Sequence, residues 1–245
     1  MPDKITVKAL FDVGKRFLSA HERYGVPEHE YRYYSYNICR EHFDNWVSLD
    51  EEQDSMILFT YLASWGMIRG SSSLLQKSPY GLKNTVRALF DYDKCCRNLD
   101  LFSDSYEESK CKLCNVYRVL CGALKKDKIE SPTITLLSKI FLGVWGNCPA
   151  FDANLKYIFN IPDVNSVKAF KNAIDKVKAK LSDEVFALTE AEIRSELKNS
   201  EFISKSKLID MYGFQRGIEE GISDIDDLEK MEKRIKLLKR RGTVD

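Results

Sequence analysis

The chain has 245 residues, of which 44% are hydrophobic, so it can bury a sizeable core and is not expected to be disordered. Its 38 Lys and Arg residues almost balance 37 Asp and Glu residues, and the net charge of +1 excludes a general electrostatic attraction to nucleic acid or to an acidic surface. A site for a polyanion must therefore be a local patch.

Apolar spacing, capping residues and helix breakers predict helices along almost the whole chain, without sustained strand alternation or an internal repeat. The predicted helices cover residues 5–23, 29–46, 48–68, 80–91, 106–122, 133–145, 153–159, 166–181, 190–198, 205–211 and 226–241. The third of them is apolar nearly all round from Met56 to Ile68, so we expect it to be the buried central element.

Capping residues predict where three of these helices begin. Ser48 followed by Glu51 is a capping-box pattern, and Ser105 is expected to cap the helix that starts at residue 106. Ser131 is expected to cap the next helix, with Pro132 at its first position.

The sequence thus predicts an all-α fold in one compact domain that spans residues 1–245. The polar stretch 91–105 is the least compact part and is expected to join two helical halves. The last helix, 226–241, is amphipathic and basic. We expect it to dock on the body, with dimerisation and contact with DNA phosphates as the alternatives.

The N-terminus lacks the apolar run of a signal peptide, and no later stretch reaches the roughly 18 apolar residues of a membrane span. We therefore expect a cytoplasmic protein that does not enter a membrane. Seven cysteines, an odd number, favour free thiols over a disulfide framework. The alternative is a zinc site, for which the candidate ligands are Cys95, Cys96, Cys111 and Cys114.

The segment from Ser138 to Asp152 combines a lysine, a tight loop and an aspartate. On the predicted helix 133–145, Lys139 projects away from the apolar face and is not expected to be core. Gly146 and Pro149 then break the chain, and Asp152, 13 positions after Lys139, lies at the start of the next short helix. An anion is stable at a helix N-terminus.

This layout resembles the lysine–helix–loop–aspartate segment of the helix-hairpin-helix DNA glycosylase superfamily. The resemblance implies a two-lobed helical body, double-stranded DNA as partner, no cofactor or metal, and removal of a damaged or modified base in repair or in defence against phage. Asp152 would stabilise the developing charge on the sugar and activate water. Lys139 would attack the sugar or, as we prefer, hold a phosphate or the leaving base.

Enzymes that act on a base must first take it out of the duplex, and aromatic side chains then fill the gap or hold the flipped base. Tyr61, Trp65, Trp145 and Phe151 are the candidates for this role. Arg69, which precedes a glycine and three serines, is the candidate for contact with a phosphate, and its alternative role is to end a helix.

The stretches 62–72 and 208–212 also resemble a group of uncharacterised bacterial helical proteins, to which no activity is attached. Two simpler interpretations remain open at this point. Asp152 would be an ordinary N-cap and Lys139 a solvated lysine. The chain would then be a non-catalytic helical module that binds DNA or another protein.

Overall fold

A computed structural model describes residues 4–22, 33–68, 74–197 and 202–221. Within these ranges the chain forms α-helices, one π-helical turn and no strand, so the all-α prediction is confirmed for them. The one bridge with β geometry pairs Ile5 with Leu181. The predicted helix 226–241 and the candidate Arg69 lie outside the described residues.

The described helices follow one another along the chain with short connections. They are α1 (Val7–Glu22), α2 (Tyr34–Asp44), α3 (Glu51–Leu62), the π-helical turn η2 (Ala63–Met67), α4 (Lys83–Cys96), α5 (Tyr106–Lys126), α6 (Ile134–Trp145), α7 (Ala153–Ile158), α8 (Val167–Lys180), α9 (Asp183–Ala187), α10 (Glu190–Glu196) and α11 (Lys205–Glu219). No described helix is both long enough and apolar enough to cross a membrane.

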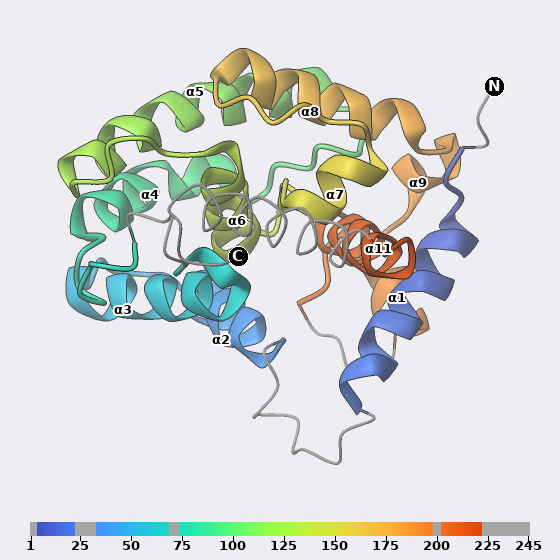
Figure 1. The fold of residues 1–245 in the computed structure, drawn as a ribbon, viewed down its shortest axis with the longest axis horizontal. Helices are drawn as coiled ribbons and strands as arrows, with labels where there is room; N and C mark the ends of the chain where they lie inside the picture. Colours follow the sequence, from blue (N-terminus) through green and yellow to red (C-terminus); the bar gives the residue numbers. More distant parts are fainter. Residues whose placement is uncertain (1–3, 23–32, 69–73, 198–201, 222–245) are drawn as a thin grey trace, which may run out of the picture.

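Helix α6 lies in the middle of the molecule, with α2, α3, α4 and α5 on one side of it and α1, α7 and α11 on the other (Figure 1). It packs against α2, α3 and α5, while α11 packs against both α1 and α7. Helix α8 crosses the upper side of the view and packs on α5. The core therefore surrounds α6.

The expectation that residues 56–68 form the central buried helix is wrong. Every residue of α6 except Thr135 is buried, whereas Met56 on α3 is 42% exposed. Apolar composition alone does not rank two such helices, because what decides burial is how many neighbours pack around each one.

Three predicted helix starts are also corrected. Helix α3 is capped by Asp50, whose carboxylate accepts the backbone N–H groups of Glu52 and Gln53, and not by Ser48. Thr133 rather than Ser131 caps α6. Ser105 precedes α5 but makes no side-chain cap. Neighbouring Ser, Thr and Asp residues compete for the cap position, and the backbone geometry at the helix start selects one of them.

Three further bounds differ from the expectation. Helix α4 continues to Cys96, so the loop expected from residue 91 begins at Arg97; that this loop joins two halves stays a prediction. Helix α11 runs eight residues beyond the expected end at Met211, to Glu219. The short helix α9 was not predicted.

Helix α3 is continued by the π-helical turn η2, in which Gly66 has φ of 75°. This left-handed conformation, which favours glycine, ends the helix and leaves the carbonyl of Trp65 outside the helical ladder. The same helix lies very close to α6 at Gly143, where a Cβ atom would overlap the ring of Tyr61. Glycine at this position therefore allows α3 and α6 to approach closely.

Candidate functional site

The loop between α6 and α7 is folded back onto α6 by side-chain bonds to its backbone. Gly146, with φ of 66°, ends α6 in the left-handed conformation. The hydroxyl of Thr135 donates to the carbonyl of Phe151 at 2.7 Å, and the hydroxyl of Ser138 accepts the Phe151 N–H at 2.8 Å. Because both ends of one residue are held by α6, Asp152 begins α7 beside the face of α6 that carries Lys139.

Asp152 caps α7, as the sequence predicted. One carboxylate oxygen, Oδ1, accepts the Leu155 N–H at 3.0 Å. The side chain is partly exposed, and its second oxygen accepts no hydrogen bond from a described residue. The capping bond fixes the orientation of the carboxylate and leaves one oxygen for another partner.

Lys139 is buried, with only 6% of its surface exposed, so the expectation that it lies outside the core is wrong. Its Nζ atom donates a hydrogen bond to the carbonyl oxygen of Trp65 at 2.5 Å. The sequence showed only that Lys139 points away from the apolar face of α6. In the structure, the end of α3 and the turn η2 cover that side of α6 as well.

Helix α11 supplies a buried ion pair to the same site. Lys207 and Asp210, one turn apart, are 1% and 5% exposed, and Lys207 Nζ lies 2.7 Å from Asp210 Oδ2. The other oxygen of Asp210 accepts the N–H of Ala150 at 3.2 Å. Asp210 therefore links α11 to the loop that leads into Asp152.

Aromatic rings from four elements surround the ammonium group of Lys207. The Nζ atom lies 4.3 Å from a ring centroid of Trp65 and 4.8 Å from that of Tyr36. The rings of Tyr33 and Phe17 follow at 5.6 Å and 5.7 Å. A desolvated cation is stabilised by the negative faces of such rings, and here the rings supplement the single carboxylate.

The charges at this site act on the carboxylate of Asp152. Burial raises the pKa of Asp152 above its ordinary value of 3.8, and the negative charge of Asp210 raises it further. The cations of Lys139 and Lys207, together with the bond from the Leu155 N–H, lower the pKa and only partly offset the burial. A carboxyl group whose pKa is raised by burial beside two lysines is typical of a functional site.

The packing of α11 on α7 depends on two glycines in α11. A Cβ atom on Gly213 would lie 2.9 Å from Cγ of Leu155, and one on Gly217 would lie 2.5 Å from Cβ of Asn154. No larger residue fits at either position without movement of α7. This close approach keeps Asp152, at the start of α7, beside the ion pair on α11.

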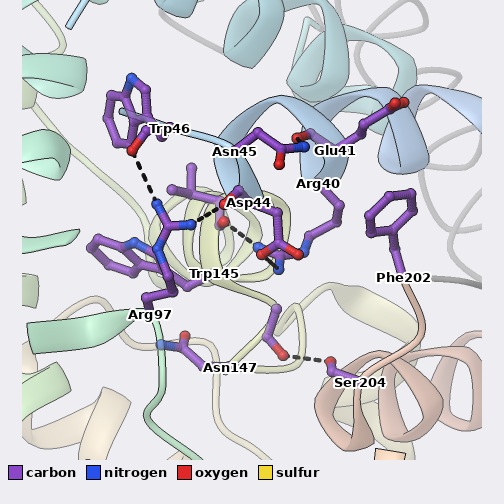
Figure 2. A network of polar contacts seen from close by, with 12 residues as sticks. Arg40, Glu41, Asp44, Asn45, Trp46, Arg97, Trp145, Asn147, Phe202 and Ser204 are labelled. Carbon is purple, nitrogen blue, oxygen red and sulfur yellow. Dashed lines mark hydrogen bonds and ion pairs between the residues drawn. The ribbon is translucent and has the colours of Figure 1, made fainter. Parts of the chain in front are cut away.

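The far end of α6 is tied to α2, α4 and α11 by a network of arginines (Figure 2). Arg40 on α2 donates to the carbonyl of Val144 and pairs with Asp44 at 2.7 Å. Arg97 donates to the carbonyls of Asp44 and Trp46. The hydroxyl of Ser204, which caps α11, donates to the carbonyl of Gly146 at 2.5 Å.

These bonds surround a polar hollow of about 470 Å³ in which Oδ1 of the buried Asn147 has no hydrogen-bond partner. The guanidinium of Arg97 and the ammonium of Lys205 are already bonded to carboxylates and carbonyl oxygens. We therefore regard this network as the clamp that fixes α6 and α11 relative to each other.

The structure brings together only some of the predicted site residues. Trp65 and Tyr61 lie against α6 at Lys139 and Gly143. Trp145 instead stacks on Phe141 in the core and donates to Asp93 at 2.9 Å. Phe151 is fully buried, with its backbone bonded to α6.

Sequence reasoning missed four residues that build the site, namely Thr135, Ser138, Lys207 and Asp210. Asp210 belongs to the stretch 208–212, which resembles other bacterial proteins, but nothing in its spacing pointed to Asp152, which lies 58 positions away. The polar Thr135 and Ser138 on a helix that is otherwise largely apolar were the available signal for a backbone contact.

Among the described residues, no group of three or more His, Cys, Asp or Glu side chains is placed to hold a metal ion. All seven cysteines are free, and Cys39, Cys96, Cys114 and Cys148 are buried. Cys95 and Cys96 lie next to each other with their sulfur atoms 3.6 Å apart. The alternative of a zinc site therefore has no support in the described geometry.

Comparison of the chain with protein-family models, with curated proteins and with solved structures gave no match. The site itself must therefore carry any statement about function.

Proposed function

We propose that the protein hydrolyses an N-glycosidic bond in DNA and removes a damaged or modified base, with Asp152 as the catalytic carboxylate. The observation that carries the proposal is the setting of Asp152. A partly exposed carboxylate with one unengaged oxygen stands beside two buried lysines, and aromatic side chains lie next to it on the turn that covers α6.

The chemistry follows from these groups. When the bond between the sugar and the base breaks, its electron pair leaves with the base and positive charge develops on the anomeric carbon. The fixed carboxylate of Asp152 stabilises that charge and takes a proton from water as the water oxygen bonds to the carbon. Its raised pKa makes Asp152 a stronger base than an ordinary aspartate.

Lys139 has a different role in this proposal. Its amine is already bonded to the carbonyl of Trp65, which argues against an attack on the sugar. Its positive charge instead faces Asp152 and holds the turn η2, with Trp65, against α6. The proposed reaction therefore uses water as nucleophile and forms no covalent intermediate.

The finer description of the fold belongs to the same proposal. A two-lobed arrangement like that of helix-hairpin-helix glycosylases would place duplex DNA across the cleft that holds Asp152, with the helices on either side of α6 as the two lobes. Trp65 and Tyr61 are the side chains that would contact a base flipped out of the duplex. With a net charge of +1, contact with the phosphates would be confined to a small patch.

The test is base release by the Asp152→Asn variant on duplex oligonucleotides that carry a panel of damaged or modified bases. Asparagine caps helices well, so the variant should fold but release no base. The matched control is Asp50→Asn, which alters the cap of α3 in the same way and should retain activity. Equal activity of the wild type and the Asp152→Asn variant would show that Asp152 is not catalytic.

The alternative is a non-catalytic helical module that binds DNA or a protein. It is favoured by the fact that Asp152 caps α7 much as Asp50 caps α3, which gives the carboxylate a structural role that requires no chemistry. A wild-type protein that binds duplex DNA but releases no base from any member of the panel would favour the module.

A further inference from the structure

We propose that the ion pair of Lys207 and Asp210 is the positioning unit of Asp152: it holds the turn that delivers the carboxylate and balances its charge. This inference rests on the proposed function, because it names the residues that would prepare the catalytic carboxylate. Neither residue was a candidate from the sequence, and both are on α11, far from Asp152 along the chain.

The first part of the argument is the connection through the backbone. Asp210 Oδ1 accepts the N–H of Ala150 at 3.2 Å, and the carbonyl of the same Ala150 accepts the N–H of Asp152 at 2.9 Å. Asp210 thus holds one side of a tight turn whose other side is Asp152. A shift of Asp210 would be transmitted to the catalytic carboxylate through one residue.

The second part is the way in which Asp210 itself is held. Its other oxygen is 2.7 Å from Lys207 Nζ, and this ammonium group is only 1% exposed. Rings of Trp65, Tyr36 and two further aromatic residues surround it at centroid distances of 4.3–5.7 Å. A lysine so enclosed has little rotational freedom, so it fixes the carboxylate that it pairs with.

The third part is electrostatic. Lys139 from α6 and the pair on α11 are the charged groups that face Asp152 from the elements packed against it. Lys207 favours the ionised form of Asp152, and Asp210 opposes it. Of the neighbouring tyrosines, Tyr36 and Tyr61 have pKa values raised by burial, so they remain uncharged. Lys207 and Asp210 therefore oppose each other in setting the charge of Asp152.

The experiment measures the titration of Asp152 in the full-length chain by carbon NMR of labelled Asp carboxyl groups, with the signal assigned from the Asp152→Asn variant. Asp210→Asn keeps an oxygen that can accept from Ala150 but removes the negative charge. It should lower the pKa of Asp152 by about one unit, at the low end of what a neighbouring charge produces. Adding Lys207→Met should return the pKa toward the wild-type value.

The matched control is Asp100→Asn. Asp100 also pairs with a lysine in the first turn of α11, Lys205, at 2.8 Å, and it too accepts a backbone N–H, that of Phe102. This variant should leave the pKa of Asp152 unchanged. An equal decrease in both single variants, no decrease with Asp210→Asn, or no return in the double variant would overturn the proposal.

A measurement on the wild type covers the case in which the variants do not fold. Two coupled carboxyl groups titrate as a pair, so the curves of Asp152 and Asp210 should each show a second inflection at the pKa of the other. Independent single-step curves would overturn the proposal. These titrations require no substrate, so they separate this inference from the proposed function: coupled titration without any base release would retain the positioning unit and reject the glycosylase.

Discussion

The amine of Lys139 on α6 donates a hydrogen bond to the backbone carbonyl of Trp65, 2.5 Å away, at the π-helical turn that ends α3. This bond joins two segments that are 74 positions apart and buries a lysine that the sequence placed on a solvated face. It also occupies the amine, so Lys139 has a structural partner before any substrate arrives.

We predict that Lys139 forms no imine with DNA. Borohydride reduction in the presence of duplexes that carry an abasic site or a modified base should trap no protein–DNA adduct, because the amine is engaged by Trp65 and water is the proposed nucleophile. The Lys139→Gln variant should keep partial activity. A trapped adduct that disappears in Lys139→Gln would show that the lysine is the nucleophile.

We predict that Lys139→Met destabilises the fold by about 1–3 kcal/mol, since the buried carbonyl of Trp65 then loses its donor. Urea unfolding followed by circular dichroism measures this loss. The control is Lys112→Met, at an exposed lysine that pairs with Glu108, and it should change the stability by less than about 0.5 kcal/mol. Similar losses in both variants would contradict the structural role of Lys139.

Asp152 should make the stability of the protein depend on pH in a particular direction. Its pKa is higher in the folded chain than its ordinary value of 3.8, so the folded state binds the proton more tightly. The contribution of Asp152 to stability is therefore greatest below pH 3.8 and falls as the pH rises through the folded pKa, by about 1.4 kcal/mol for each unit of difference. Asp152→Asn does not titrate, so the free energy of unfolding of the variant minus that of the wild type should increase across this window. A constant difference would contradict the raised pKa.

The close approach of α3 and α6 predicts opposite effects for two glycine substitutions. Gly143→Ala should destabilise the fold by about 1–3 kcal/mol, because the added Cβ atom overlaps the Tyr61 ring and these packed helices must move apart. Gly122→Ala, inside α5 with no atom within 4 Å of the added Cβ, should stabilise it by about 0.5–1 kcal/mol. Thermal unfolding of the two variants tests this, and equal effects would contradict the described packing.

If the protein binds DNA, the affinity should depend only weakly on salt. A net charge of +1 implies few phosphate contacts, and the slope of log affinity against log salt concentration is proportional to their number. Duplex affinity measured by fluorescence anisotropy at several salt concentrations should give a shallow slope. No binding at low salt would reject both the glycosylase and the DNA-binding alternative.

Helix type and order were predictable from the sequence because they depend on local periodicity. Helices α1 and α7 lie close to their predicted bounds, and Asp152 caps α7 as expected. Ser48 failed as the cap of α3 because Asp50, two residues later, is equally suited and the chain geometry selects it. Local patterns thus identify an element more reliably than its first residue.

The sequence by itself determined an all-α chain and a lysine followed at a fixed interval by an aspartate at a helix start, because these features depend on residues near one another in the chain. Only the tertiary structure decided that Lys139 is buried, that Trp145 and Phe151 belong to the core, and that Lys207 and Asp210 reach the loop before Asp152. These outcomes depend on which helix covers which face of α6. That choice results from packing between segments distant in the chain, such as the close contact of Gly217 with Asn154, and no local pattern records it.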